Sequence, residues 1–201
     1  MQEKNYSLVK IELADPTPLG LLGLAMVTLV ASTQKLGLTE GVAFVLPWAI
    51  FLGAIAQIIA SLLDFKHNNL FGSIAFSGYG LFWLAVSTSW LIKSGLFGSE
   101  LAAAADAHQL GYAFLGYLVF SIFVTIAAFR LNTLLSILML LIDLLFLGLA
   151  FDTLGLGAYW HSLAAYSEIL ISVLSFYGSG AALVNKSYGR IILPTGKPWT
   201  K

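Results

Sequence analysis

The sequence predicts an all-α polytopic membrane protein with six transmembrane helices, and two observations carry that prediction. Of the 201 residues, 59% are hydrophobic and only 10% are charged, whereas a soluble domain has about 25% charged residues. The hydrophobic residues gather in long runs, and a helix needs about 20 apolar residues to cross roughly 30 Å of hydrocarbon. The six runs lie at residues 18–33, 41–63, 71–92, 111–129, 132–151 and 160–184.

One membrane domain, predicted at residues 15–184, accounts for nearly all of the chain. Residues 1–14 precede it as a tail or a short helix on the membrane surface, and residues 185–201 follow as a basic tail. Six spans place both tails on one side of the membrane. The Lys and Arg residues then divide eight against two, and cytoplasmic segments carry the excess of positive charge. Both tails are therefore predicted to be cytoplasmic, in a multi-pass protein of the inner or plasma membrane. The eight are Lys4, Lys10, Lys66, Arg130, Lys186, Arg190, Lys197 and Lys201, and the two are Lys35 and Lys93.

The first span begins with residues 15–21, which read Asp-Pro-Thr-Pro-Leu-Gly-Leu. Proline suits the first turn of a helix because the N–H group that it lacks would go unpaired there. Asp15 or Thr17 can cap the free N–H groups that follow. The apolar run after this start is short for a membrane span. Two interpretations remain: a rigid starting turn, or a helix N-terminus at membrane depth that can bind an anion.

The later spans differ in how regular their sequences are. The second contains Pro47, and the third is interrupted by Gly72, Gly78 and Gly80. A polar, alanine-rich connection at residues 93–110 leads to the fourth, fifth and sixth spans. Tryptophans fall near the span ends, as interfacial aromatic residues do. These are Trp48, Trp90, Trp160 and Trp199.

Polar residues inside the spans recur at the spacing that places them on one helix face. Five spans carry a hydroxyl- or amide-bearing face, and the first span carries a weaker one. Small hydroxyl residues often hold membrane helices together, so a single stripe indicates packing. All the stripes together favour helices that surround a central pathway in each protomer. The stripes are Leu24, Thr28 and Ser32; Gly53, Gln57, Ser61 and Asp64; Tyr79, Trp83 and Ser87; Tyr117, Ser121 and Thr125; Asn132, Ser136, Met139 and Asp143; and Glu168, Ser172, Ser175 and Ser179.

Two carboxylates lie deep in the predicted spans. Asp143 is near the middle of the fifth span, and Glu168 is two or more turns inside the sixth. Charged groups at such depth are costly and usually face an interior or a water-filled cavity. Both residues are therefore candidates for proton transfer or selectivity. The alternative is a neutral, hydrogen-bonded acid that packs against another helix or subunit. Asp64, beside Lys66 and His67, is expected to be a solvated interfacial residue.

Other kinds of chemistry find little support. The sequence has no cysteine, which excludes disulfides and thiolate metal sites. His67, His108 and His161 are far apart and fall on both sides of the predicted membrane, so they do not predict a metal site. There is neither a phosphate-binding glycine loop nor a nucleophile elbow. Without such motifs the sequence predicts no enzyme and no cofactor. A net charge of zero gives no indication of a nucleic-acid partner.

Five motifs, in order along the chain, resemble signatures of the acetate uptake transporters, the family of bacterial succinate–acetate permeases and fungal acetate permeases. Residues 15–21 resemble that family's Asn-Pro-Ala-Pro-Leu-Gly-Leu signature. Residues 53–57 (Gly-Ala-Ile-Ala-Gln) are similar to its glycine-to-glutamine segment in the second span, and residues 69–72 (Asn-Leu-Phe-Gly) to its Gly-Asn-Thr-Phe-Gly run. Residues 76–83 resemble its Ser-Tyr-Gly-x-Phe-Trp run, and residues 188–194 its Phe-Gly-Arg-x-x-Leu-Pro run.

The resemblance implies a six-helix protomer that assembles as a homo-hexamer in the lipid bilayer, with one pathway per subunit. It implies the passage of acetate, and of succinate in bacterial members, by proton-linked symport or through an anion channel. The family's hydrophobic constriction falls at Leu24, Tyr79 and Ile142, and such a constriction can gate by dewetting. The substrate is expected to enter near the start of the first span, where no strong fixed cation awaits it. The candidates for substrate binding are Pro18, Gly20, Gln57, Thr28 and Ser136.

Departures from the family pattern bear on this expectation. Asp15 and Thr17 replace the Asn and Ala of the first signature, Asp143 falls where bacterial relatives carry a neutral residue, and Glu168 where they tend to have a small one. An ionised Asp143 would repel a carboxylate about 4 Å away by about 4 kcal/mol at a dielectric constant of about 20. Either Asp143 is protonated when substrate passes, or it points away, or the substrate is not a simple anion. The main alternative is therefore a channel for a small neutral or cationic solute, and the second is a non-transporting membrane assembly factor.

Overall fold

The computed structural model describes residues 13–200, which form helices and connections without any strand. Six helical segments in this range are long and apolar enough to cross a membrane, which confirms the predicted all-α fold with six spans. They are α1 (Thr17–Lys35); the second span, built from α2 (Val45–Trp48), η1 (Ala49–Ala56) and α3 (Gln57–Lys66); α4 (Leu70–Lys93); α6 (Ala107–Ala128); α7 (Thr133–Thr153); and α8 (Ala158–Tyr188). The predicted surface helix or tail at residues 1–14 falls almost entirely outside the described residues, as do Lys4, Lys10 and Lys201.

Three boundaries refine the sequence prediction. The first span gains residues at both ends and is 19 residues long, close to what a membrane span needs. A short helix, α5 (Ser99–Ala104), lies within the alanine-rich connection, where the high helix propensity of alanine favours it. The last helix continues to Tyr188 and ends at Gly189, whose φ of 62° is the left-handed conformation that glycine adopts at helix C-termini.

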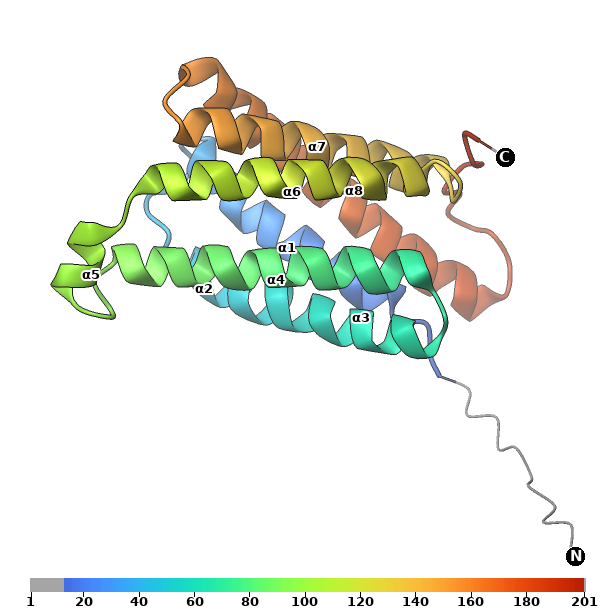
Figure 1. Ribbon diagram of the computed structural model, residues 1–201. Helices are drawn as coiled ribbons and strands as arrows, with labels where there is room; N and C mark the ends of the chain where they lie inside the picture. The colour runs from blue at the N-terminus through green and yellow to red at the C-terminus, as the bar shows by residue number, and fades with distance from the viewer. Residues whose placement is uncertain (1–12, 201) are drawn as a thin grey trace, which may run out of the picture.

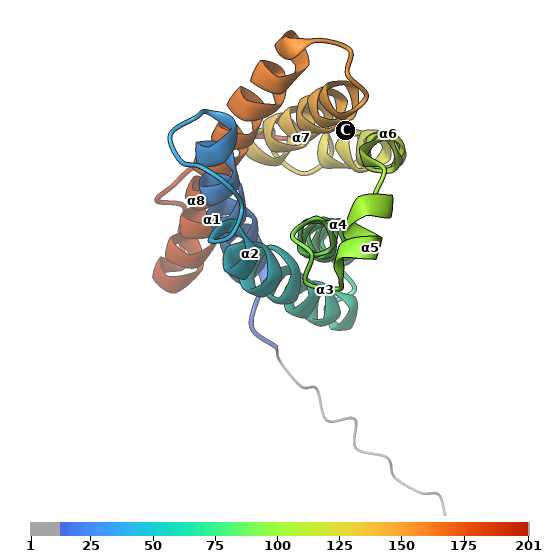
Figure 2. The ribbon, with the colours of Figure 1, turned by 90° about the vertical axis from the view of Figure 1, so that its left-hand side faces the viewer.

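The six spans form a closed ring (Figures 1 and 2). Around this ring α1 packs against α8, α8 against α7, and α7 against α6. On the other side of α1 lies η1, and η1 and α3 pack against α4. The contact between α4 and α6 closes the ring and is less extensive than the others. We call the end of the bundle that carries residues 13–16 and 189–200 the near end, and the opposite end, which carries α5, the far end.

The second span widens where it crosses its neighbours. Residues 49–56 form π-helical turns, which are rare and frequently occur at functional sites. The α1 backbone approaches them so closely that a Cβ on Gly23 would collide with the carbonyl oxygen of Leu52. A Cβ on Gly53 would lie 2.9 Å from Cγ of Trp83 on α4. Glycine is therefore needed at both positions to bring three helices together around η1.

Several hydroxyls of the polar stripes hold helices together, while other stripe residues, among them Gln57 and Glu168, line cavities inside the ring. Thr28 Oγ1 donates to the carbonyl of Leu24 within α1 (2.7 Å). Other hydroxyls donate to backbone carbonyls of neighbouring helices. These bonds run from Ser172 to Ala25 (2.9 Å), from Ser179 to Pro18 (2.7 Å) and from Ser61 to Ser73 (2.7 Å). Helical spacing shows which residues share a face, but it does not show whether that face meets a cavity or another helix.

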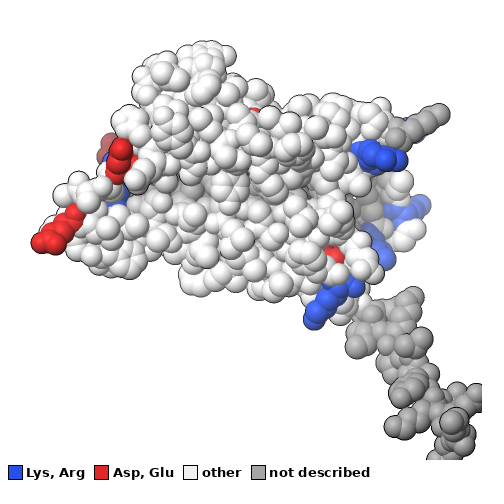
Figure 3. Space-filling model, viewed as in Figure 1, with Lys and Arg blue, Asp and Glu red and all other residues white. Residues whose placement is uncertain are grey.

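The two ends of the bundle differ in charge: in Figure 3 most of the blue basic side chains lie at the near end and most of the red acidic ones at the far end. The near end carries Lys66, Arg130, Lys186, Arg190 and Lys197. The C-terminal segment folds back over the start of α7, where the N–H of Leu134 donates to the carbonyl of Thr195 (2.9 Å). Trp199 stacks on Phe129 with ring centroids 5.3 Å apart. These contacts hold the C-terminal segment beside the near-end opening of the ring.

Candidate functional site

Two cavities enter the ring from its opposite ends and approach each other at a narrow waist. The near cavity has a volume of about 380 Å³, and the far cavity has about 210 Å³. The waist between them has about 10 Å³, no more than the roughly 10–15 Å³ that one water molecule needs. Leu24 and Tyr79 line both the near cavity and the waist, while Phe82 and Trp83 line both the waist and the far cavity. The three spaces therefore follow one another along the ring.

Three helix N-termini meet at the near cavity. Thr17 at the start of α1, Asn69 before α4 and Asn132 before α7 all line it. Asn69 Oδ1 accepts a hydrogen bond from the N–H of Gly72 (3.2 Å), and Asn132 Oδ1 accepts one from the N–H of Leu135 (2.9 Å), so both residues cap their helices. Helix N-termini carry partial positive charge, and the exposed Arg130 also lines this cavity. The near cavity is thus suited to an anion.

The structure shows that the Asp15 carboxylate binds a backbone N–H group at the start of α1. Asp15 Oδ1 accepts a hydrogen bond from the N–H of Thr17 at 2.9 Å. A carboxylate beside a helix N-terminus is stabilised by the partial positive charge there. Asp15 is exposed and does not line the near cavity. The negative charge of Asp15 is therefore stabilised by the start of α1 and does not form part of the near-cavity wall.

Gln57 brings a buried amide to the wall of the near cavity. Its side chain is fully buried, and Nε2 donates to the carbonyl of Gly53 at 2.7 Å. This bond fixes the orientation of the amide, because the reverse assignment would place two acceptors against each other. Oε1 is buried and has no hydrogen-bond partner among the described residues. A buried acceptor without a partner is costly, so Gln57 can accept a hydrogen bond from a bound solute or from water.

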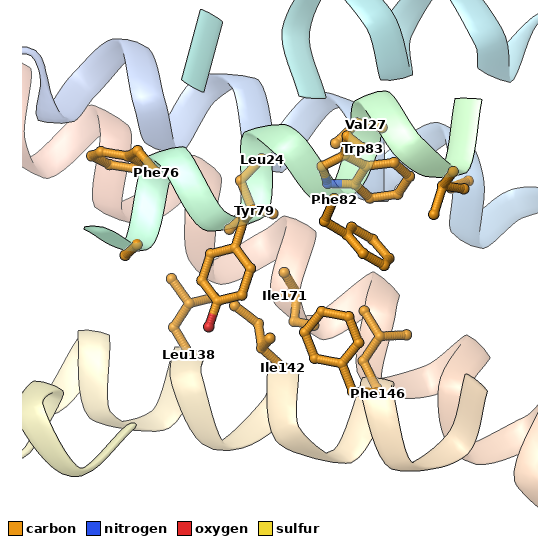
Figure 4. Close-up of a cluster of buried hydrophobic side chains, with 14 of the residues drawn as sticks. Leu24, Val27, Phe76, Tyr79, Phe82, Trp83, Leu138, Ile142, Phe146 and Ile171 are labelled. Atoms are coloured by element: carbon orange, nitrogen blue, oxygen red, sulfur yellow. The ribbon is translucent and has the colours of Figure 1, made fainter. Parts of the chain in front are cut away.

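The waist is built from aliphatic and aromatic side chains. Leu24 of α1, Tyr79 of α4 and Ile142 of α7, the three residues of the expected constriction, all line it. Figure 4 shows Tyr79 extending from α4 toward Leu138 and Ile142 on α7. The Tyr79 hydroxyl lies 3.0 Å from Ser121 Oγ and donates to Met139 Sδ at 3.7 Å. Its polar end is therefore engaged by neighbouring helices.

Four ionisable residues lie in the far cavity. Lys35 Nζ donates to Glu168 Oε2 at 2.9 Å, with exposed fractions of 14% for the Lys35 side chain and 1% for that of Glu168. His161 Nδ1 lies 2.9 Å from Asp152 Oδ2, and His161 Nε2 lies 3.0 Å from the carbonyl oxygen of Lys35. The aromatic rings of Trp83 and Phe82 separate this charged cluster from the waist.

Comparison with known proteins identifies the family. The model of the GPR1/FUN34/yaaH family matches residues 1–198. The chain belongs to this family. Its relatives include the succinate-acetate/proton symporter SatP of Escherichia coli (strain K12), which is 32% identical over 188 residues that cover 92% of this chain and 97% of SatP. Acetate permease A of Emericella nidulans is 27% identical over 208 residues, covering 93% of this chain and 67% of the permease.

A solved structure of this family has the same fold. The structure of the bacterial acetate channel SatP superposes with a TM-score of 0.86 and 31% sequence identity. The match covers 92% of this chain and all of the SatP chain. These GPR1/FUN34/yaaH relatives are transporters and a channel rather than enzymes, in agreement with the sequence prediction.

The structure brings some of the residues singled out from the sequence to the cavities and leaves others away from them. Leu24, Tyr79, Ile142 and Thr28 meet at the waist, Gln57 reaches the near cavity and Glu168 the far cavity. Pro18, Gly20 and Ser136 line none of these three spaces. The Pro18 carbonyl accepts from Ser179 (2.7 Å), Gly20 packs against the Phe76 ring, and Ser136 Oγ donates to the carbonyl of Asn132 (3.0 Å).

Two of the acids lie in surroundings that the sequence did not settle. Asp143 faces α6, where Thr125 Oγ1 donates to its Oδ2 at 2.8 Å, and it lines neither cavity nor the waist. Of the alternatives stated for Asp143, the side chain that points away from the pathway fits this position. Asp64 was expected to be solvated, and that expectation is wrong. It is 1% exposed, and its Oδ1 accepts from Asn69 Nδ2 at 3.0 Å.

Sequence reasoning missed several residues of the site. Arg130 entered only as one of the charges that set the orientation, although it lines the near cavity. Asn132 was singled out only as a member of a polar stripe, although its position directly before α7 was a usable N-cap signal. Lys35 was treated as a loop residue, and nothing in the sequence pairs it with Glu168. The aromatic residues Phe82 and Phe146 completed the waist without any polar signal.

Proposed function

We propose that this chain transports small carboxylates, the monocarboxylate acetate first and the dicarboxylate succinate second, along the near cavity, the waist and the far cavity. The observation that carries the proposal is the pair of cavities that meet at an apolar waist inside a single ring of helices. The three helix N-termini and Arg130 at the near cavity support an anionic substrate. The names of the relatives, a succinate-acetate/proton symporter and an acetate permease, support the same substrate class.

The waist acts as the gate in this proposal. Leu24, Tyr79 and Ile142 leave room for at most one water molecule, and a constriction of this kind can close by dewetting. A bare carboxylate that enters such a space loses its hydration without a compensating partner, which is costly. The proposal therefore has the acid cross together with a proton, so that no net charge passes the gate. Both proton-linked symport and a channel that passes the protonated acid satisfy this condition.

Gln57 is the proposed substrate ligand on the near side of the waist. Its Oε1 is a buried acceptor without a partner among the described residues. A protonated carboxylic acid has an O–H group that can donate to this oxygen, whereas a carboxylate has none. Gln57 therefore supports recognition of the protonated acid on the near side of the waist.

The proposal extends to placement in the membrane and to assembly. The basic near end supports a cytoplasmic location for both tails in the inner or plasma membrane. The family resemblance supports a homo-hexamer with one pathway per subunit. The apolar outer faces of α6 and α8 are large enough to contact lipid or neighbouring subunits. Their exposed residues include Tyr112, Val119, Phe123, Leu170 and Val173.

Uptake of labelled acetate into proteoliposomes, with and without an inward proton gradient, tests the proposal. Acetate that enters faster than into protein-free liposomes, and faster still with the gradient, is the expected result. A neutral solute (urea) and a cationic one (methylammonium) are measured in parallel. Protein-dependent flux of either solute without any flux of acetate would overturn the proposal and favour the alternative channel.

A further inference from the structure

The charged cluster of the far cavity is arranged as two linked ion pairs. One pair joins Lys35 of α1 to Glu168 of α8, and the other joins His161 of α8 to Asp152 of α7. The two nitrogens of His161 face a carboxylate and a backbone carbonyl, which are both acceptors. Both bonds form only when each nitrogen carries a hydrogen. In this state the four residues carry two positive and two negative charges, so the cluster is neutral.

Lys35 is the more accessible member of its own ion pair, although the side chains of His161 and Asp152, 44% and 35% exposed, are the most exposed of the cluster. The Lys35 side chain is 14% exposed, whereas the Glu168 behind it is 1% exposed. The ammonium group sits on a flexible four-carbon stem, and its three hydrogens can bind a new acceptor without movement of the helix. While Glu168 is ionised, a second carboxylate gains the attraction of Lys35 but meets the repulsion of Glu168. A neutral Glu168 removes that repulsion and frees Lys35.

We propose that the far cavity is a loading site where Lys35 exchanges Glu168 for the carboxylate of the substrate as Glu168 takes up a proton. This inference rests on the proposed function and assigns its proton coupling to one ion pair. The proton comes from the solution at the far end and binds Glu168 Oε2. The bond between Lys35 Nζ and that oxygen breaks, and Lys35 Nζ then donates to a substrate oxygen. One proton and one anion enter together, so the cluster and its ligand remain neutral overall.

The walls of the cavity select the substrate class. Phe82, Trp83 and Val86 form an apolar side toward the waist, opposite the charged cluster. A carboxylate bound to Lys35 therefore directs its organic end at these rings. A short monocarboxylate satisfies both sides, whereas a second carboxylate would be placed against apolar rings without a partner. The site thus favours acetate over a dicarboxylate.

The charged groups around Glu168 are accounted for on each helix that packs against α8. In the described part of the chain, α1 contributes Lys35 and α7 contributes Asp152, while α8 itself contributes His161. Asp143, the other acid of α7, faces α6 instead. Because Glu168 contacts Lys35 directly and His161 contacts the Lys35 carbonyl, Glu168 is the acid whose protonation changes the partner of Lys35.

The test is binding of labelled acetate to the purified wild-type protein over a pH series, combined with calorimetry in buffers that differ in ionisation enthalpy. Protonation and anion binding strengthen each other by the same factor. For the wild type we expect uptake of about one proton per acetate, and a dissociation constant that rises with pH by about tenfold per unit wherever Glu168 is ionised in the free protein. No proton uptake by the wild type would overturn the inference without the need for a variant.

Variants locate the proton. Glu168→Gln should remove the pH dependence and bind acetate at least tenfold more tightly than the wild type at about pH 8. Glu100→Gln, on the exposed far-end helix α5 and away from the cavity, is the matched control and should behave as the wild type does. A Glu168→Gln protein that keeps the full pH dependence would place the proton elsewhere and overturn the inference.

The doubly neutral variant Lys35→Gln/Glu168→Gln tests Lys35 without leaving a buried charge unpaired. It should bind acetate at least tenfold more weakly than Glu168→Gln at every pH. Equal affinity of the two variants would exclude Lys35 as the ligand of the anion. Transport of acetate by the wild type, combined with either contrary result, would reject the loading site while leaving the proposed function in place. Absence of acetate transport by the wild type would reject the proposed function itself.

Discussion

Shortening Leu24 to alanine should open the waist. Leu24 is 5% exposed and lines both the near cavity and the waist. The waist holds about 10 Å³ of free volume, and Leu24→Ala removes three carbon atoms from its wall. The enlarged space can hold water, so a barrier that depends on dewetting should fall. We expect acetate uptake to rise at least tenfold, which corresponds to a barrier lower by about 1.4 kcal/mol.

The same substitution has a cost in stability. Burial of three carbon atoms contributes about 2.4 kcal/mol at about 0.8 kcal/mol each. Replacement of a buried leucine by alanine costs about 2.7–5.0 kcal/mol when the cavity stays empty. Because the vacated space joins cavities that water can enter, we expect a loss of about 2–3 kcal/mol, near the lower end of that range. Thermal unfolding in detergent measures this loss beside the uptake assay.

The control is Leu22→Ala, the same substitution two residues earlier on α1. Leu22 is 38% exposed and lines neither cavity nor the waist. The Leu22→Ala protein should transport acetate at the wild-type rate. Our reasoning is refuted if a folded Leu24→Ala protein transports acetate no faster than Leu22→Ala does, because the waist would then not limit the flux.

Three further predictions concern packing, the near cavity and Asp143. A Cβ at Gly23 would collide with a backbone carbonyl of η1, so Gly23→Ala should lower the free energy of unfolding by about 1–3 kcal/mol. Its control is Gly180→Ala, which has open space around it and should be neutral or stabilising by up to about 1 kcal/mol. Thermal unfolding measures both. Arg130→Gln should raise the KM for acetate about two- to fivefold at low salt and less at high salt. Lys186→Gln, at the same end but away from the cavity, is its control. An equal change in KM for both variants would show that Arg130 has no specific role. Asp143→Asn should keep the pH dependence of uptake, because Asp143 faces α6 and lines neither cavity; a flattened profile would transfer the proton-carrying role to Asp143.

The sequence was sufficient to predict the six spans and the overall fold because long apolar runs have few other uses. It was not sufficient to predict the neighbours of each helix. Lys35 and Glu168 are 133 positions apart, and their pairing depends on the packing of α1 against α8. The same limit applies to the hydroxyl stripes, since a face turned toward a helix and a face turned toward a cavity have the same spacing. Charge and capping residues at the mouths, such as Arg130 and Asn132, acquire their significance only when the helix ends are brought together.

The expected constriction and the expected ligands differed in how far the sequence could locate them. Leu24 and Tyr79 were placed by motifs at fixed positions in their spans, and Ile142 lies with them at the waist. Pro18 and Gly20 belong to the motif at the start of α1, yet the Pro18 carbonyl accepts a hydrogen bond from Ser179 of α8 and the Gly20 backbone lies against the Phe76 ring. A motif identifies a segment, whereas the rotation of the helix decides which of its residues faces the cavity.

The central claim is that substrate passes the waist, and the most direct measurement is acetate uptake by a protein whose waist is filled. Ile142 is 3% exposed and lines the waist, whereas Leu140, on the same helix, is 37% exposed and lies outside it. Proteoliposomes with Ile142→Trp should take up labelled acetate no faster than protein-free liposomes, while those with Leu140→Trp should match the wild type. A folded Ile142→Trp protein that transports acetate at the wild-type rate would contradict the pathway.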